Sequence, residues 1–229
     1  MTADFRQFAP ATERNRSFIL ALLQRVLPPQ GTVLEISSGT GEHAVFFAPH
    51  LQPRSWIPSD VDPIALASIA AWRDHSPSPN LWPPIALDVQ QPIWPLEQSP
   101  LPLPLTGWQD PLTAIVNINM IHITPWTCCE ALMAGAGRCL EPGGVLYLYG
   151  PFKRGGVHTA PSNEAFDQFL RSQNPEWGVR NLEAVETIAV SHGFQLTTIE
   201  EMPANNLSLV FVKITAFGSG SDHGGNRSN

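Results

Sequence analysis

The amino-acid sequence predicts an α/β protein built on a doubly wound, mostly parallel sheet of seven strands, with the last strand antiparallel. Two observations predict this class. Short apolar runs alternate with segments of helical periodicity along most of the chain, which is typical of a parallel sheet covered by helices on both faces. The chain then closes with two successive strands, Gln195–Glu200 and Leu207–Ile214, and such a hairpin adds one antiparallel strand.

Composition favours one folded domain with a small-molecule partner. Of the 229 residues, 43% are hydrophobic and 14% charged, which is enough apolar material for a substantial core. We expect this domain to span residues 1–217, and the Gly/Ser/Asn-rich tail at 218–229 to be disordered because it lacks hydrophobic residues. The net charge of −7 argues against nucleic acid, which is bound by clustered Lys and Arg.

The cysteines and the N-terminus point to the cytoplasm. Cys128, Cys129 and Cys139 match neither a disulfide framework nor the paired spacing of a zinc site, so we expect free thiols in a reducing compartment and no metal. Asp4 and Arg6 interrupt the N-terminus before an apolar signal core can form. Because no apolar run approaches the length of a membrane span, no membrane partner is expected. The oligomeric state stays open.

The first half of the chain begins with a helix and continues with strands that each lead into a helix. In order, we expect a helix at Thr12–Leu27, a strand at Thr32–Ile36, a helix from the following glycine turn to about His50, and a strand at Ser55–Ser59. The first helix is predicted from apolar residues at helical spacing, and Pro28 ends it. A third helix starts at Asp62-Pro63, because aspartate caps helices and proline suits the first helical position.

The second half repeats this pattern around a long irregular segment. We expect strands at Ile85–Val89, Ala114–Ile118 and Val145–Tyr149, and helices at Pro125–Leu140, Asn163–Ser172 and Asn181–His192. Between the first two of these strands, Gln90–Pro111 is rich in Pro, Leu and Trp and shows no periodicity. A loop of that length is typical of a functional segment or an insertion, and we assign residues 89–112 to it.

A glycine turn, Gly39-Thr40-Gly41, follows the first strand and is the central functional signal. Glycine allows a sharp turn and a close approach of a ligand to the backbone. Open α/β sheets bind ligands at this carboxyl edge of their strands. The turn with Ala44 also satisfies the Gly-x-Gly-x-x-Ala fingerprint of dinucleotide sites, so a nicotinamide cofactor stays an alternative.

One carboxylate follows or ends each of the first three strands. Glu35 lies just before the glycines and is suited to accept a bond from a cationic amine or a bound water. Asp60 comes about twenty residues after Gly41, which suits a ribose diol. Asp88 follows the third strand, where a carboxylate can meet an adenine amino group. This set predicts a zwitterionic ligand that carries adenosine.

Further motifs extend over nearly the whole chain except the Pro-rich loop and the tail. They are Glu13-Arg14-Asn15, Glu35 to Ala44, Pro58-Ser59-Asp60, Leu87-Asp88-Val89, Asn117 to Trp126, Tyr149 to Phe152, Ser162-Asn163, Phe166-Asp167, Trp177 to Arg180 and Met202 to Asn206. With these motifs the chain resembles class I S-adenosylmethionine-dependent methyltransferases. More narrowly, it is similar to the methyltransferase-like family catalogued as domain of unknown function 938, which includes relatives of methyltransferase-like protein 26.

The resemblance implies S-adenosyl-L-methionine as cofactor and S-adenosyl-L-homocysteine as product. It places Glu35, Ser37, Gly39 and Gly41 around the methionine moiety, Asp60 at the ribose, Asp88 and Val89 at the adenine, Asn119 and Met120 beside the methyl group, and Arg14 and Asn15 over the cofactor carboxylate. A solvated position on the helix surface is the alternative for Arg14.

Two positions depart from the family pattern. Ser37 stands where class I enzymes most often carry the first glycine of the turn, and we expect it to be tolerated if its backbone stays in an ordinary region. Asn181 follows Arg180 where the family is expected to have aspartate. An Arg–Asp pair at that corner is therefore left open.

His122 is the candidate catalytic residue, because it follows the fourth strand where this architecture faces the transferable methyl group. Methyl transfer is an in-line displacement, and positioning alone can contribute roughly 7–11 kcal/mol. A histidine near neutral pH is suited to act as general base. The alternative is that His122 only orders its loop.

Several aromatic and polar residues are candidates for the acceptor pocket. They are Trp126, Phe152, Asn163, Trp177, Arg180, Asn205 and Asn206. A pocket of this kind combines apolar walls with a few convergent polar groups. The alternatives are that the aromatic residues belong to the core and that Asn205-Asn206 only forms a turn.

Together these observations predict methyl transfer from S-adenosylmethionine to a small molecule, with O-methylation slightly preferred. Because the chain has no Asn-Pro-Pro-Tyr string, methylation of adenine or cytosine amino groups is disfavoured. Two alternatives stay open: a protein that binds S-adenosylmethionine without methylating, and an NAD-dependent oxidoreductase.

Overall fold

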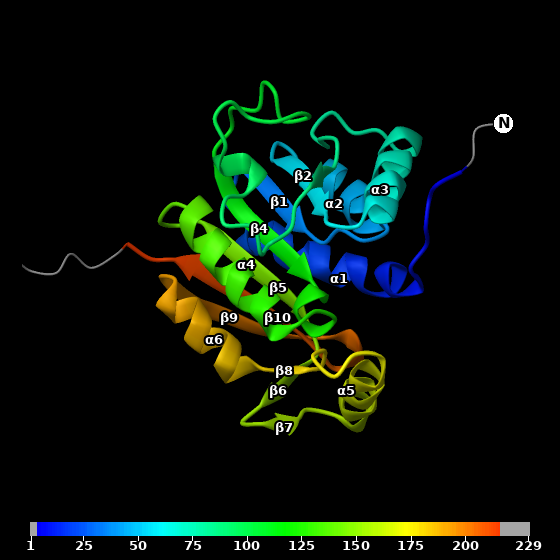
Figure 1. Ribbon diagram of the computed structural model, residues 1–229, viewed down its shortest axis with the longest axis vertical. Coiled ribbons are helices and arrows are strands. Elements are labelled where there is room, and N and C mark those ends of the chain that lie inside the picture. The colour runs from blue at the N-terminus through cyan, green and yellow to red at the C-terminus, as the bar shows by residue number, and fades with distance from the viewer. Residues whose placement is uncertain (1–3, 216–229) are drawn as a thin grey trace, which may run out of the picture.

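The computed structural model describes residues 4–215 and consists of a central sheet between two layers of helices, with a small lobe at one side (Figure 1). The main sheet contains β1 (Thr32–Ile36), β2 (Ser55–Asp60), β3 (Ile85–Ala86), β4 (Leu112–Ile118), β5 (Val145–Gly150), β9 (Phe194–Met202) and β10 (Asn206–Lys213). The helices are α1 (Pro10–Val26), α2 (Glu42–His50), α3 (Pro63–His75), α4 (Trp126–Cys139), α5 (Pro161–Gln173) and α6 (Leu182–Ser191).

The sheet confirms the predicted fold class. Its strand order is β3-β2-β1-β4-β5-β10-β9, and the first five strands are parallel to one another. Strand β10 is antiparallel to both β5 and β9 and lies between them. As expected for a central parallel strand, β1 is buried along its whole length.

Helices cover both faces of the sheet and divide the core into two clusters. On one face, Leu132 of α4 and Val185 of α6 pack against the strands. On the other face, Ile19 of α1 and Phe47 of α2 do the same. Figure 1 shows α4 and α6 in front of the sheet, with α1 and α2 on its other side. This two-sided cover makes the sheet doubly wound.

Strand β3 is shorter than predicted. We expected Ile85–Val89, but pairing with β2 stops at Ala86. The Asp88 carboxylate accepts the backbone N–H of Gln90 at 2.9 Å, a local turn that competes with strand pairing. Leu87 and Val89 remain buried in the core, so their apolar character reflects packing and not a longer strand.

A second sheet was not predicted. It consists of β6 (Phe152–Arg154), β7 (Val157–His158) and β8 (Arg180–Asn181), in the order β7-β6-β8. Strands of two or three residues are too short to show a periodic pattern. With α5 they form the small lobe at the bottom of Figure 1.

The Pro-rich segment is anchored in the core. Trp94 and Leu105 are fully buried, and the Trp94 indole donates a hydrogen bond to the Val89 carbonyl at 3.2 Å. A short 3₁₀ helix, Pro95–Glu97, follows Trp94. The segment is therefore irregular but packed, and its function stays a prediction.

Two further expectations concern the ends of the chain and membranes. The predicted disordered tail at 218–229 lies outside the described residues. Within residues 4–215, no helix has the length and apolar character that crossing a bilayer demands.

Candidate functional site

The candidate site lies at the carboxyl edge of the main sheet, where the strand order reverses between β1 and β4. The turns after β1, β2 and β4 meet there. Because β10 is antiparallel to β5 and β9, the turn between β9 and β10 reaches the same edge. The sheet therefore brings together segments that are far apart in the sequence.

The glycine turn after β1 borders open space. Gly39 and Gly41 have φ angles of 57° and 90°, in the left-handed region that favours glycine. A methyl group built on Gly41 would come within 2.7 Å of the Ile69 Cα in α3, whereas one built on Gly39 would meet nothing within 4 Å. Gly41 thus permits helix packing, and Gly39 leaves room for a ligand.

Ser37 does not keep an ordinary backbone, so the condition under which we expected it to be tolerated is not met. Its φ angle is 55°, in the left-handed region. A side chain that carries a Cβ is strained there by about 1–2 kcal/mol. Ser37 thus adopts the left-handed conformation for which class I enzymes use glycine, although it is not a glycine.

Asp60 ties the glycine turn to the end of β2. Its Oδ2 accepts the Gly39 N–H at 2.9 Å, and its Oδ1 accepts the Asp62 N–H at 3.0 Å. The carboxylate therefore lies directly beside the turn, at the place predicted for a ribose contact. Asp88, at the end of the neighbouring segment, is half-buried.

Glu35 is buried beneath the turn and does not face open space. Its side chain is 2% exposed, and its Oε2 accepts a hydrogen bond from the Trp56 indole at 2.9 Å. Burial raises the pKa of the Glu35 carboxyl to about 7, although the hydrogen bonds from Trp56 and Ser38 act in the opposite direction. Near neutral pH this carboxyl is therefore partly protonated.

A cavity of about 590 Å³ opens between α1, α5 and the β9–β10 turn. Its polar lining is Arg14, Asn15, Asn119, Tyr149 and Asn206, and its apolar lining is Ala11, Ile123, Phe166, Pro203 and Ala204. Four of the predicted site residues thus meet in one cavity. Hereafter this cavity is called the main pocket.

Tyr149 is the functional candidate that the sequence reasoning missed. It is the last residue but one of β5, and it is only 3% exposed although it lines the main pocket. Burial raises the pKa of Tyr149, while hydrogen bonds from the Asn15 and Asn206 side chains lower it. The signal that the sequence offered was a phenol hydroxyl near the carboxyl end of a mostly apolar strand.

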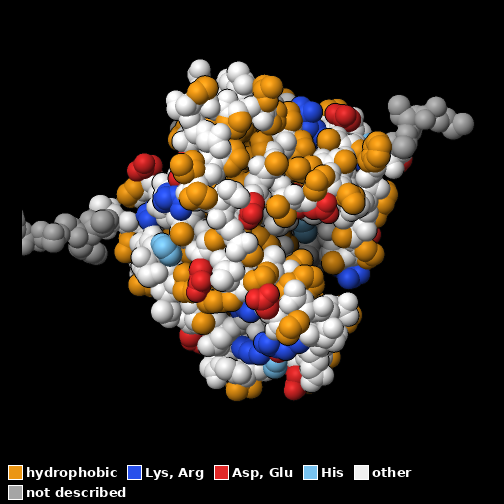
Figure 2. Space-filling view, viewed as in Figure 1, with side chains coloured by type: hydrophobic (Ala, Val, Ile, Leu, Met, Phe, Trp, Pro, Cys, Tyr) orange, Lys and Arg blue, Asp and Glu red, His pale blue; other side chains and the backbone are white. Residues whose placement is uncertain are grey.

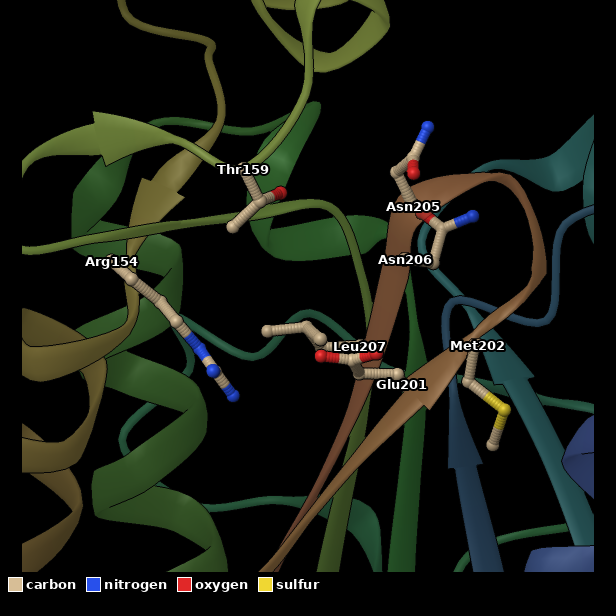
Figure 3. A pocket seen from close by; sticks show the side chains of 7 residues that line it. All are labelled: Arg154, Thr159, Glu201, Met202, Asn205, Asn206 and Leu207. Atoms are coloured by element: carbon tan, nitrogen blue, oxygen red, sulfur yellow. The ribbon is translucent and has the colours of Figure 1, made fainter.

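Two smaller cavities adjoin the main pocket at the β9–β10 turn. One, of about 380 Å³, is lined by Asn163, Asn205 and Asn206 among others. The other, of about 210 Å³, lies between Arg154 of β6 and the hairpin, as Figure 3 shows. Asn206 borders all three cavities, so the three cavities lie around the β9–β10 turn.

The predicted residues at this turn also hold it in place. Asn163 of α5 donates hydrogen bonds to the Asn205 carbonyl at 2.8 Å and to the Thr159 hydroxyl at 3.0 Å. The Asn205 side chain donates to the Ser162 hydroxyl at 3.0 Å. These bonds fasten the hairpin to α5.

The lobe that carries α5 is stabilised by a buried carboxylate. Asp167 pairs with Lys153 at 3.1 Å and with Arg171 at 3.2 Å. Lys and Arg side chains gather over this lobe, and the surface is hollowed between the lobe and the rest of the molecule (Figure 2). Because α5 also presents Phe166 to the main pocket, these ion pairs help to position one of its walls.

His122 does not reach the main pocket. Its side chain is 0% exposed, and its ring packs edge-on against Phe152 with 4.9 Å between centroids. A methyl group built on Gly150 would come within 2.4 Å of His122 Nε2 and 3.1 Å of Asn119 Oδ1, so both side chains pack close to Gly150. Burial lowers the pKa of His122 to about 3. Its position does not support the predicted role as general base.

Several other predicted residues also turn away from the pocket. Val89 and Met120 of the cofactor set, and Phe152 of the substrate set, are buried in the core. The Arg180 guanidinium lies 5.6 Å from the ring centroid of Trp126. None of these side chains lines the main pocket, because each packs against other side chains in the folded chain.

Arg180 is held by backbone carbonyl groups. They take the place of the acidic partner in the Arg–Asp pair that the sequence left open. It donates hydrogen bonds to the carbonyls of Ile121 at 2.8 Å, Thr124 at 2.6 Å and Glu176 at 2.9 Å. Trp177, one of the predicted substrate residues, is half-buried in the same corner. Neither residue is among those that line the main pocket.

Comparison with known proteins agrees with this architecture. The model of a family described as "Protein of unknown function (DUF938)" matches residues 6–213. Among solved structures, human N-acetylserotonin methyltransferase in complex with S-adenosylmethionine is 15% identical with a TM-score of 0.70, covering 90% of this chain and 53% of that chain.

Two bacterial structures are similar to the same extent. An O-methyltransferase family 2 protein from Planctomyces limnophilus, in complex with apigenin, is 18% identical with a TM-score of 0.66, covering 87% of this chain and 62% of that chain. An O-methyltransferase family protein from Burkholderia thailandensis is 10% identical with a TM-score of 0.69, covering 90% and 58%.

The chain spans little more than half the length of these solved structures, and at such low identity the likeness concerns the fold. The family match, in contrast, extends over most of the sequence. This protein therefore belongs to the family described as protein of unknown function DUF938, and its domain has the fold of class I S-adenosylmethionine-dependent methyltransferases.

Proposed function

We propose that this protein transfers a methyl group from S-adenosylmethionine to a small molecule, with oxygen slightly preferred as the acceptor atom. The main support is one arrangement: the glycine turn, with open space at Gly39 and Asp60 bonded to it, follows β1 at the carboxyl edge of the sheet where Asn119, after the neighbouring strand β4, lines the main pocket. A cofactor over β1 and β2 would direct its methyl group toward β4 and β5. That is the side on which the pocket lies.

The described residues fit such a cofactor. Gly39 leaves space for a ligand above the turn, and Asp60 offers a carboxylate at the adjacent strand end for a ribose diol. Asn119 has a left-handed backbone with φ 67° and lines the pocket after β4, where it would flank the methyl group. When bound, S-adenosylmethionine supplies an electrophilic methyl group on a sulfonium sulfur.

The first test is cofactor binding by calorimetry. We expect S-adenosylhomocysteine to bind and NAD not to bind. Asp60→Ala should weaken S-adenosylhomocysteine binding roughly 10- to 100-fold, because it removes a charged hydrogen-bond acceptor. Asp60→Asn is the matched control: it keeps an oxygen acceptor for the Gly39 N–H and should lose less affinity. Unchanged affinity in Asp60→Ala would refute the ribose assignment.

The second test is methyl transfer itself. The protein is incubated with labelled S-adenosylmethionine and a metabolite extract, and the labelled product is identified. Labelled product supports the proposal. Binding of S-adenosylhomocysteine without any transfer would favour the alternative of a cofactor-binding protein that does not methylate, and binding of NAD alone would favour an oxidoreductase.

A further inference from the structure

The polar side chains that line the main pocket can donate hydrogen bonds, and none of them is a base. Arg14 donates only, and the carboxamides of Asn15, Asn119 and Asn206 are not basic near neutral pH. Among the described residues that line this pocket, none is Asp, Glu, His or Cys. An acceptor bound there therefore meets no side chain suited to remove its proton.

The two nearest histidines do not fill this role. His43 of α2 stands behind Asn15 and donates from Nε2 to Asn15 Oδ1 at 2.8 Å. Burial, together with the charge of Arg16, lowers the pKa of His43 to about 4. A carboxamide between His43 and the pocket cannot pass a proton on. His122 is fully buried and does not line the pocket.

The hydrogen bond from His43 also orients Asn15. With Asn15 Oδ1 occupied by His43, the Asn15 amide nitrogen is the group left to face the Tyr149 oxygen. The Asn206 side chain approaches the same oxygen. Tyr149 lines the main pocket, and its protonated hydroxyl can donate a hydrogen bond to a ligand bound there. Burial keeps Tyr149 protonated, because its pKa lies above the usual value.

We infer that the acceptor is a small, mainly apolar molecule that reacts as a preformed anion, such as a carboxylate, a thiolate or an acidic phenolate. The Tyr149 hydroxyl donates a hydrogen bond to this anion. This inference rests on the proposed function. Phe166 and Pro203 supply apolar surface for the body of such a molecule. Arg14, which the resemblance places over the cofactor carboxylate, is exposed and also lines this pocket, where it adds positive charge.

The methyl transfer balances without a base. A lone pair of the acceptor anion forms the new bond to the methyl carbon while the bond from that carbon to sulfur breaks, and the bonding pair remains on sulfur. The positive sulfonium and the negative acceptor become two groups without charge. No proton moves, so a pocket that offers donors and no base is sufficient.

Binding of three matched probes tests this inference on the protein saturated with S-adenosylhomocysteine. The probes are 4-nitrobenzoate, 4-nitrobenzamide and 4-nitrobenzylammonium, which share a ring and differ in charge. By calorimetry we expect the anion to bind at least about tenfold more tightly than the other two. Tyr149→Phe should remove about tenfold of the anion's affinity, since it deletes one donor to a charged group, and leave the affinity for S-adenosylhomocysteine unchanged.

Tyr147→Phe is the matched control. The chain has only two tyrosines, and Tyr147 lies two residues earlier on β5, fully buried, with its hydroxyl bonded to Ser208 at 2.7 Å. We expect Tyr147→Phe to leave the affinity for all three probes unchanged. Far-UV circular dichroism checks that both variants are folded.

Three results would overturn the inference: equal affinity for the cation and the anion, an anion affinity that Tyr149→Phe does not change, or no binding of any probe at millimolar concentration. Failure of the proposed function looks different, because S-adenosylhomocysteine would then not bind, or would bind without any labelled product in the transfer experiment. The charge preference can be measured in that case on the protein alone.

Discussion

Ser37 and Ala204 hold left-handed backbone conformations at the border of the site although neither is glycine. Their φ angles are 55° and 58°. Ala204 and Asn205, with φ 59°, are consecutive left-handed residues that connect β9 to β10, as tight hairpin turns require. Such positions cost free energy and persist where the surrounding structure enforces them, often beside functional sites. Here both border the proposed ligand sites.

Ser37→Gly should therefore stabilise the protein by roughly 1 kcal/mol, because glycine adopts this conformation without a Cβ clash. Urea unfolding monitored by tryptophan fluorescence measures the change. Ser37→Ala is the control, since it keeps the Cβ and should bring no gain. Equal stability of Ser37→Gly and the unmodified protein would show that the turn is not strained.

At the scale of elements, the Pro-rich segment is fastened to α4. The Trp94 ring lies against Gly135, and a methyl group built there would come within 2.0 Å of Trp94 Cζ2. Glu97, three residues later, forms a two-point ion pair with Arg138 of the same helix, at 2.9 and 3.0 Å. A glycine inside a helix is otherwise unfavourable, so close approach of the indole accounts for Gly135.

Gly135→Ala should destabilise the protein by about 1–3 kcal/mol, because the added methyl group overpacks the contact with Trp94. Thermal and urea unfolding measure the loss. Gly137→Ala is the control in the same helix, where the nearest atom to a new Cβ is the His192 carbonyl oxygen at 3.1 Å. If both variants lost the same stability, the indole contact would not be the cause.

At the scale of the whole molecule, three buried titratable groups shape the pH dependence of stability. Burial lowers the pKa of His122 to about 3 and that of His43 to about 4, from 6.5. The stability that these two histidines contribute is fully present above pH 6.5 and is lost as the pH falls. Burial raises the pKa of Glu35 from 4.5 to about 7, so its contribution is present below pH 4.5 and is lost as the pH rises.

Between pH 4.5 and 6.5 these effects oppose each other. The unfolded chain binds two more protons at the histidines, and the folded chain binds one more at Glu35, so stability should rise with pH by about 1.4 kcal/mol per unit. In Glu35→Gln the opposing proton is gone, and the slope should be about twice as large. Glutamine keeps an oxygen acceptor for the Trp56 indole.

Urea unfolding at several pH values measures both slopes. Glu35→Gln should also be more stable than the unmodified protein at pH 8, by about 3 kcal/mol, because no buried carboxyl has to ionise. His43→Gln, which can still donate to Asn15, serves as the comparison and should reduce the slope. Parallel pH profiles for Glu35→Gln and the unmodified protein would contradict this account.

Sequence reasoning was most successful where local chemistry decides the structure. Strand β1 has the predicted bounds, Thr32–Ile36, and Asp62 caps α3 as expected by accepting the Ile64 N–H at 2.9 Å. It was least successful where a residue's role depends on distant neighbours. The short strands β3 and β8 form by pairing with β2 and β6, segments well separated from them in sequence, which no local pattern contains.

The candidate site divides in the same way. The glycine turn and Asp60 are readable from the sequence because strand, glycines and acid lie within one strand–helix–strand unit, where spacing determines geometry. The main pocket is not, since Arg14, Tyr149 and Asn206 come from α1, β5 and the last hairpin. Only the fold shows that they share one cavity.

The sequence alone determined the α/β class, the order of the main elements and the glycine turn after β1, because apolar periodicity, helix caps and glycine turns act over a few residues. The tertiary structure alone decided which polar side chains face the cavity. His122 is fully buried away from the pocket, and Tyr149 lines it. The physical reason is that burial and hydrogen bonding depend on atoms that the chain brings together only when it folds.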